Sequence, residues 1–229
     1  MATVETKKPI ASRRAAMRRE REREIVAATR RLFDERGLQD APIEDIARAV
    51  GINKGLIYRH FSSKEELFVL TLTTYLSDLA DQLDGISMEL DPVAQLQQGW
   101  RRYTDYCLEH PAFLDCGMSL MRRPAAELRE EISDAVWIRL GQGMAGCLGR
   151  LSRILARGAA QGLFTVEDPD FTANHLYTQT LGTMHLARIG VGVRAGAGGV
   201  PEPFAIDPLR VQEACIADVL ASVGAAPRS

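Results

Sequence analysis

Cysteine is scarce in this sequence and long apolar runs are missing, and both absences narrow the class of protein. The four cysteines, Cys107, Cys116, Cys147 and Cys215, are scattered over 229 residues and form no Cys-x-x-Cys pair. A disulfide scaffold or a structural zinc site needs denser or paired cysteines, so we expect buried reduced thiols and no metal. No segment approaches the ~18 apolar residues of a membrane span, and the charged amino terminus is unlike a secretory signal. We therefore expect a cytoplasmic protein that makes no membrane contact.

Charge is divided unevenly along the chain. Residues 1–64 hold 15 basic and 9 acidic side chains, a net charge of +6, whereas residues 65–229 hold 13 basic and 21 acidic, a net charge of −8. This division favours a polyanionic partner for the first part of the chain only. Residues 1–17 are polar, contain Pro9 and show no sustained periodicity, so we expect a flexible basic arm there.

Apolar residues repeat at helical spacing through the rest of the chain. Caps, prolines and glycines delimit helices at about residues 18–37, 43–50, 53–60, 63–83, 91–109, 112–121, 125–161, 168–189 and 207–223. A break in the long stretch 125–161 is expected near Gly141 and Gly143. Residues 190–203 are rich in Gly, Ala and Val and predict a flexible loop. We find no alternating strand, so the predicted fold is all-α.

Residues 43–60 have the pattern of a helix-turn-helix. Two short helices that cross closely need a small residue at the crossing and a turn residue free to adopt positive φ, and Ala47 and Gly51 occupy these places. The apolar seam between the helices consists of Ile46, Val50, Ile52 and Ile57. In such a motif the second helix lies in the major groove of DNA.

The stretch from Gly37 to Glu65 closely resembles the amino-terminal domain of TetR-family transcriptional regulators. The resemblance covers residues 18–70 and rests on Leu-x-Tyr-x-His-Phe at 56–61, on Ser-Lys-Glu at 63–65 and on the spacing from Ile46-Ala47 to Tyr58. It implies a three-helix DNA-binding domain at 18–64, joined to a larger helical domain at 65–229 that binds a small effector and dimerises.

Two positions depart from the usual pattern of that family. Ala41-Pro42 stands where the family usually has a Thr or Ser that often touches phosphate, so the hydroxyl for that contact is missing. Leu56 stands before the Ile57-Tyr58 pair, where the family commonly has Thr, and this changes the side chains offered to the groove.

DNA contacts are expected from the second helix of the motif and the residues just after it. Arg59, on the same face as Lys54, can pair with both major-groove acceptors of a guanine, while Tyr58 and Lys64 suit phosphate. The predicted DNA-binding residues are Asn53, Lys54, Gly55, Tyr58, Arg59, His60 and Lys64. Of these, Gly55 permits close approach to the DNA, and His60 could instead be a buried spacer against the first helix.

The larger domain contains aromatic and sulfur-containing residues of the kind that line small-molecule pockets. The predicted lining residues are Trp100, Tyr103, Cys107, Phe113, Met118, Met121, Trp137, Met144, Tyr177, Met184 and His185. An apolar or amphipathic effector fits this set. The same residues could instead form only the core of the domain.

A symmetric homodimer is expected because one helix-turn-helix reads too few base pairs for a specific site. Small residues follow one stripe on each of the helices 170–189 and 208–222, which would let two copies pack closely. The predicted interface residues are Leu176, Thr180, Thr183, Ala187, Val211, Ala214 and Cys215. These stripes could instead cover the core of their own domain.

The predicted function is a ligand-responsive transcriptional repressor, released from a palindromic double-stranded DNA operator by its effector. Repression is preferred because it predominates in the family that the sequence resembles. One alternative is an architectural DNA-binding protein without an effector, which would have no internal cavity. The other is a helical enzyme that uses Cys107 and His110. No glycine-rich oxyanion loop or phosphate cradle accompanies that pair, so neither catalysis nor a cofactor is expected.

Overall fold

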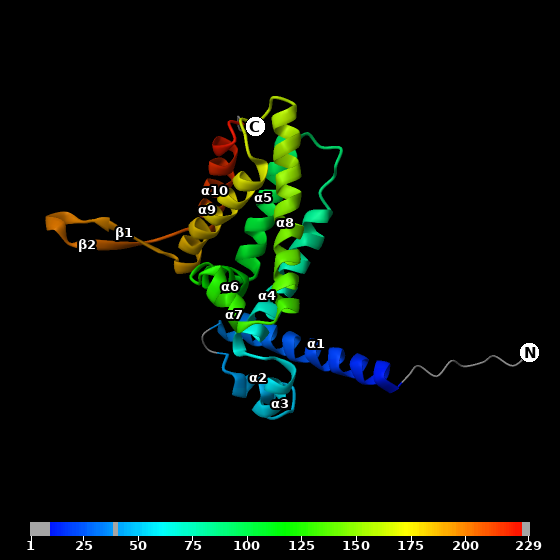
Figure 1. The fold of residues 1–229 in the computed structure, drawn as a ribbon. Helices are drawn as coiled ribbons and strands as arrows, with labels where there is room; N and C mark the ends of the chain where they lie inside the picture. Colours follow the sequence, from blue (N-terminus) through cyan, green and yellow to red (C-terminus); the bar gives the residue numbers. More distant parts are fainter. Residues whose placement is uncertain (1–9, 39–40, 226–229) are drawn as a thin grey trace, which may run out of the picture.

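The computed structural model describes residues 10–38 and 41–225, and it is helical apart from one projecting hairpin (Figure 1). A small bundle at one end holds α1 (Ile10–Arg36), α2 (Ile43–Ala49) and α3 (Lys54–His60). The larger domain consists of α4 (Lys64–Asp84), α5 (Pro92–Glu109), α6 (Pro111–Met121), α7 (Ala125–Glu131), α8 (Asp134–Ala160), α9 (Pro169–Ile189), β1 (Val191–Ala195), a 3-10 turn (Ala197–Gly199), β2 (Pro201–Ala205) and α10 (Pro208–Ser222). The all-α prediction, with a helix-turn-helix unit before a larger helical domain, is confirmed.

The core of the larger domain is centred on α4. This helix packs on α8 along most of its length and also contacts α1, α5 and α6, while α9 lies between α8 and α10. Tyr75 in the middle of α4 is completely buried, as are Leu96 of α5 and Leu155 of α8. In the part of the chain that the structure describes, no helix is both long enough and apolar enough to cross a membrane.

The first helix begins earlier than its periodicity predicts. Residues 10–17, expected to belong to a flexible arm, form the first turns of α1, whereas residues 1–9 of that arm lie outside the described residues. The extension is rich in Ala and Arg, which favour helix. Further along the exposed part of α1, ion pairs at helical spacing join Arg18 to Glu22 at 2.8 Å and Arg21 to Glu24 at 2.7 Å.

The long stretch 125–161 is interrupted in a different place from the one expected. The break falls at Ile132 and Ser133, between α7 and α8, and α8 continues as a helix through Gly141 and Gly143. A Cβ atom on Gly143 would lie 3.1 Å from the Leu76 side chain of α4, which is tighter than ordinary contact. The glycine therefore permits close approach of two helices rather than ending one.

The expectation of a flexible loop at 190–203 is wrong, because these residues form most of an antiparallel hairpin. β1 pairs with β2 in a register that places Val193 opposite Pro203 and Ala195 opposite Pro201. Two glycines with positive φ, Gly198 at 69° and Gly199 at 81°, make the tight connection. The hairpin extends away from the helices, and Val193 is 69% exposed (Figure 1). The alternation Val-x-Val-x-Ala in β1 did not predict a strand because the segment is rich in glycine.

Candidate functional site

The turn between α2 and α3 sets the geometry of the helix-turn-helix. Gly51 has φ of 67°, a conformation that other residues rarely adopt, and the next residue, Ile52, donates its N–H to the Ala47 carbonyl at 2.9 Å. Asn53 then caps α3, because its side-chain oxygen accepts the Leu56 N–H at 2.9 Å. Ala47 and Ile57 are buried at the crossing of the helices. The motif is therefore packed through one face of α3, which leaves the other free.

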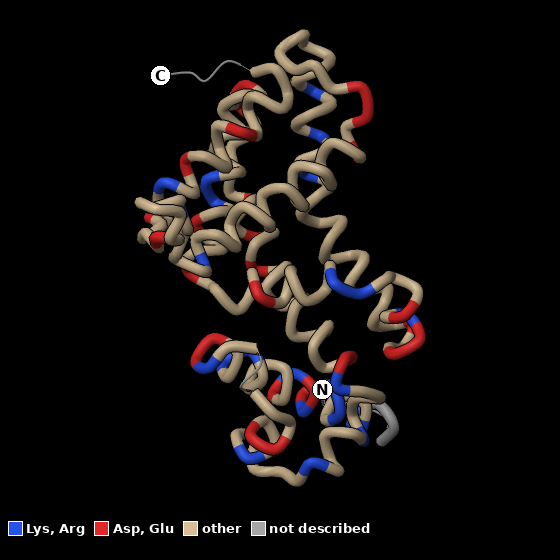
Figure 2. Tube along the Cα trace, turned by 90° about the vertical axis from the view of Figure 1, so that its left-hand side faces the viewer, with Lys and Arg blue, Asp and Glu red and all other residues tan. Residues whose placement is uncertain are grey.

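The free face of α3 presents a phenol and two cationic groups to solvent. Tyr58 is 44% exposed, and the side chains of Lys54 and Arg59 are also exposed, while Asn53 and Gly55 expose the beginning of the helix. In Figure 2, Lys and Arg segments lie along the lower rim of the small bundle, on the side away from the larger domain. Such a surface offers donors and positive charge to phosphates and base edges.

Lys54 makes an ion pair within this surface. Its Nζ lies 2.6 Å from Oε1 of Glu44, which belongs to the first turn of α2. The hydrogen bond with Lys54 lowers the pKa of Glu44, and the same bond raises the pKa of Lys54. Both side chains are exposed, so the pair is weak and solvent-screened, and Lys54 can leave it for another anion.

His60 lies differently from the other predicted DNA-binding residues. Its side chain is 14% exposed, and its Nδ1 lies 3.6 Å from Oε1 of Glu22 on α1. The ring also faces Phe61, with 6.4 Å between centroids. The structure therefore places His60 between α3 and α1, whereas the other six predicted residues are exposed.

Lys64 begins α4 at the edge of the same surface. Ser63 caps this helix, since its hydroxyl oxygen accepts the Glu66 N–H at 2.9 Å. The same hydroxyl donates to the carbonyl of Glu131, at the end of α7, at 2.7 Å. Exposed Lys64 therefore stands at a helix amino terminus, where backbone N–H groups favour an anion such as phosphate.

Arg30 joins the small bundle to the middle of α4. Its Nη1 lies 2.5 Å from Oδ2 of Asp78, and its guanidinium carbon lies 4.2 Å from the ring centroid of Tyr75. The Tyr75 hydroxyl in turn donates to Asp34 of α1 at 2.7 Å. A shift of α4 must therefore be transmitted to α1 or break these contacts.

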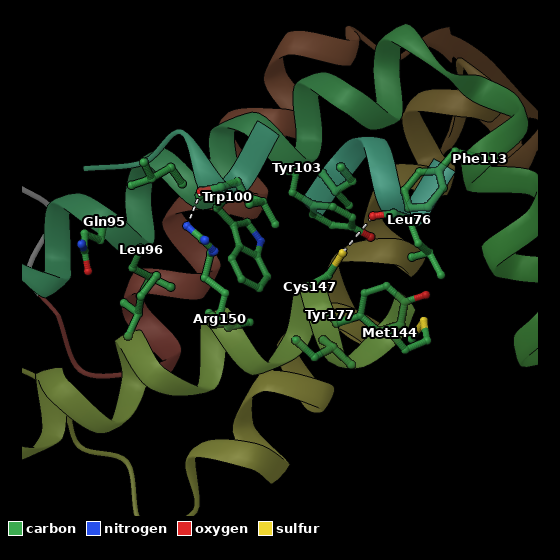
Figure 3. Close-up of a pocket in the computed structure, with 17 residues that line it drawn as sticks. Leu76, Gln95, Leu96, Trp100, Tyr103, Phe113, Met144, Cys147, Arg150 and Tyr177 are labelled. Carbon is green, nitrogen blue, oxygen red and sulfur yellow. Dashed lines mark hydrogen bonds between the residues drawn. The ribbon is translucent and has the colours of Figure 1, made fainter. Parts of the chain in front are cut away.

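A cavity of about 60 Å³ lies inside the larger domain, beneath the second half of α4. Figure 3 shows Trp100 and Tyr103 on one side of it and Met144 and Tyr177 on the other. Seventeen residues line the cavity: Leu76, Leu79, Leu83, Ile86, Gln95, Leu96, Gly99, Trp100, Tyr103, Phe113, Met144, Cys147, Leu148, Arg150, Leu151, Ile154 and Tyr177. A mainly apolar space of this kind suits a small organic ligand.

The structure brings five of the predicted pocket residues to this cavity, namely Trp100, Tyr103, Phe113, Met144 and Tyr177. The other six lie outside its lining: Cys107, Met118, Met121, Trp137, Met184 and His185. Of these, Cys107 and Met184 are buried in the core, whereas Met121 is 44% exposed at the end of α6.

Sequence reasoning missed most of the aliphatic lining, which α4 and α8 supply. Leu76, Leu79 and Leu83 share one face of α4, and Cys147, Leu151 and Ile154 share one face of α8. The helical spacing of apolar residues in both segments was visible in the sequence. It did not reveal the pocket because spacing identifies an apolar face without identifying what that face encloses.

Burial keeps the Cys107 thiol unreactive. Desolvation raises its pKa to about 12, so the thiol is protonated at neutral pH, whereas a nucleophilic cysteine needs the thiolate. His110 lies at the junction of α5 and α6, with its ring 4.4 Å from that of Tyr106. Nor do three His, Cys, Asp or Glu side chains gather as metal ligands among residues 10–38 and 41–225.

The predicted dimer stripes are only partly accessible on the single chain. Leu176, Thr180, Val211 and Cys215 are enclosed by their own domain, and Thr180 accepts a hydrogen bond from Nε1 of Trp100 at 2.8 Å. These four side chains are not available to a second copy. Of the remaining predicted residues, Ala214 is exposed, whereas Thr183 and Ala187 are half-buried.

The packed turn, the exposed face of α3 and the larger helical domain define a helix-turn-helix DNA-binding protein. Residues 25–70 match the family described as bacterial regulatory proteins, tetR family. The regulator BetI of Cronobacter sakazakii is 31% identical over 160 residues, which cover 65% of this chain and 76% of BetI. The repressor NicS of Pseudomonas putida is 27% identical, with 67% of this chain and 68% of NicS covered. The chain belongs to the TetR family, whose members regulate transcription and typically bind operators and small ligands as dimers.

Other similarities are confined to shorter segments or to the fold. The match with the regulator HbdR of Aromatoleum is 35% identical but spans only 31% of that protein. The crystal structure of RolR in complex with resorcinol aligns with a TM-score of 0.66 and 20% sequence identity, over 93% of this chain and 91% of RolR. That likeness extends the family fold over the larger domain.

Proposed function

We propose that this protein is a cytoplasmic, ligand-responsive repressor that binds a palindromic DNA operator as a homodimer and leaves it when an effector fills the cavity. One observation carries the proposal: α4 begins at the DNA-facing surface with Lys64 and lines the cavity with Leu76, Leu79 and Leu83. A ligand that moves the second half of this helix also moves its first turn. The cavity favours this function over an architectural DNA-binding protein without an effector.

The side chains proposed to contact DNA divide into two roles. Tyr58 and Lys64 contact phosphates, together with Lys54 once it leaves Glu44, and Arg59 reads a base edge. Asn53 and Gly55 allow the start of α3 to approach the groove. His60 keeps its place in the proposed site as the side chain that sets α3 against α1.

The proposed dimer uses the outer faces of α9 and α10. Thr183, Ala187 and Ala214 are the predicted interface residues that a second copy can reach. Two copies related by a two-fold axis would place their α3 helices about 34–36 Å apart, one turn of DNA, and so read an inverted repeat.

A selection from random duplex DNA tests this function with the full chain. Sequences retained by the protein should be inverted repeats, and Arg59→Ala should lose preference at one base pair of each half-site. A cavity-binding compound should then lower operator affinity, typically by 5- to 150-fold, measured by fluorescence anisotropy. If no sequence is enriched, the proposed DNA readout is wrong. If cavity ligands never change operator affinity, the regulatory part of the proposal is wrong.

A further inference from the structure

Most of the polar side chains around the cavity form hydrogen bonds or ion pairs with other groups of the protein. Gln95 donates to the Ser87 carbonyl at 2.7 Å and accepts from Arg157 at 2.7 Å, and Trp100 donates to Thr180. Arg150 donates to the Leu83 carbonyl at 2.5 Å and pairs with Asp84. The residues that line the cavity therefore include no unpaired cationic side chain for a negatively charged ligand.

Two phenol hydroxyls of the lining are exceptions, those of Tyr103 and Tyr177, and of these the hydroxyl of Tyr103 is the fully buried one. Tyr103 is only 7% exposed, lines the cavity and has no hydrogen-bond partner for its buried hydroxyl among the described residues. The Cys107 thiol is close enough to influence the pKa of this phenol, but it makes no hydrogen bond of normal geometry with it. Burial raises the pKa of Tyr103 well above its usual range, so the hydroxyl remains a neutral donor. A buried hydroxyl without a partner is costly, and a ligand that supplies one removes that cost.

Aromatic rings surround this hydroxyl-bearing side chain. The ring centroids of Trp100, Phe113 and Tyr177 lie 6.0, 6.4 and 6.2 Å from that of Tyr103, within the range of favourable aromatic contacts (Figure 3). The volume of about 60 Å³ is below the ~150 Å³ of an apolar cavity that holds benzene, so even a single-ring ligand requires the lining to open, and the unbranched side chain of Met144 is able to give way.

We propose that the cavity takes a neutral, single-ring aromatic molecule with one hydrogen-bonding oxygen, which pairs with the Tyr103 hydroxyl. This inference rests on the proposed function, because it names the chemical class of the effector for the same cavity. It assigns Tyr103 as the residue that determines specificity between an oxygen-bearing ring and a hydrocarbon of the same shape.

The test compares phenol with toluene, which has nearly the same shape but no hydroxyl. Binding is followed by the fluorescence of Trp100 in full-length protein carrying Trp137→Phe, so that the tryptophan in the cavity is the reporter. Tyr103→Phe should retain toluene binding but reduce the ratio of phenol affinity to toluene affinity roughly 2- to 12-fold, the range expected for one neutral hydrogen bond.

Tyr106→Phe is the matched control. Tyr106 lies about one turn further along α5, outside the cavity lining, and its hydroxyl donates to the Tyr75 carbonyl at 3.1 Å. The affinity ratio should be unchanged in this variant. An unchanged ratio in Tyr103→Phe, an equal loss in Tyr106→Phe, a loss in Tyr177→Phe instead, or no binding of either probe would each overturn the inference.

Operator affinity measured with the same samples separates the two proposals. If phenol binds through Tyr103 but leaves operator affinity unchanged, the ligand class stands and effector-driven release fails. If compounds of another class release the operator while phenol does not bind, regulation stands and the ligand class fails.

Discussion

Ser133, the residue before α8, donates its hydroxyl to Oε1 of Glu66 in the first turn of α4, at 2.5 Å. The other carboxylate oxygen of Glu66 accepts from the backbone N–H and the hydroxyl of Ser62, each at 2.5 Å. Glu66 is 7% exposed. One buried carboxylate therefore joins the segment that follows α3 to the start of α8, which lines the cavity further along.

Removing the Ser133 hydroxyl should destabilise the protein. Ser133→Ala leaves one Glu66 oxygen without this donor, and we expect the free energy of unfolding to fall by about 1–2 kcal/mol. Urea unfolding followed by circular dichroism measures the change. Ser222→Ala is the control, because its exposed hydroxyl bonds only its own helix, and it should stay within about 0.5 kcal/mol of wild type. Equal losses in both variants would contradict the role of Glu66.

The same carboxylate should give a pH-dependent contribution to stability. Burial opposes ionisation of Glu66, but the hydrogen bonds from Ser133 and Ser62 outweigh it and lower its pKa below the ordinary value of 4.5. Because the pKa of Glu66 is lower in the folded than in the unfolded protein, ionised Glu66 stabilises the fold at pH values above the unfolded pKa. This contribution disappears as the pH falls through the folded pKa. The stability difference between wild type and Glu66→Gln should thus be constant from pH 8 to about 6 and shrink below about pH 4.5. A difference that grows on acidification would contradict this.

Phosphate and base contacts should respond differently to substitution. Lys64→Ala should weaken binding to all DNA sequences alike and reduce the salt slope of log affinity by about one. Arg59→Ala should instead cost roughly 1–3 kcal/mol at one base pair of each half-site and relax preference there. Fluorescence anisotropy at several salt concentrations measures both effects. Arg153→Ala, at an exposed position on α8, is the matched control, and a salt slope that falls equally in this variant would contradict the assignment of Lys64.

The proposed dimer interface can be tested by a substitution on α9. Thr183→Arg places a large charge on the outer face of α9, so we expect folded monomers with weak operator binding, measured by analytical ultracentrifugation and anisotropy. Gln98→Arg, at an exposed position on α5, should remain dimeric. A Thr183→Arg variant that stays dimeric and binds DNA normally would place the interface elsewhere.

The same substitution at two glycines of α8 should change the stability of the fold in opposite directions. A Cβ atom on Gly158 would lie 2.0 Å from the buried Phe164 ring, so Gly158→Ala should destabilise the fold by about 1–3 kcal/mol. Gly141 has open space around it, and Gly141→Ala should stabilise the fold by about 0.5–1 kcal/mol through helix propensity alone. Thermal unfolding distinguishes the two outcomes, and stabilisation by both would show that Phe164 yields at little cost.

Local signals predicted the helix ends well. Asp91, Asp168 and Asp207 each cap the helix that their Asp-Pro pair announces, and Gly51 makes the turn that residues 43–60 require. Such features depend on neighbours within a few residues, so the chain order already contains them. The same locality misled at Gly141 and Gly143, since a glycine within a helix can also serve a close contact with another helix.

The sequence by itself determined the helix-turn-helix, the all-helical class and the residues of α3 that point away from its seam, because each depends on short-range spacing. Only the tertiary structure decided that α4 and α8 supply most of the cavity lining, that Thr180 bonds Trp100 instead of facing a partner, and that Glu66 meets Ser133. Helical periodicity defines an apolar face but not the surface opposite it. That surface comes from segments tens of residues away, and their packing fixes it.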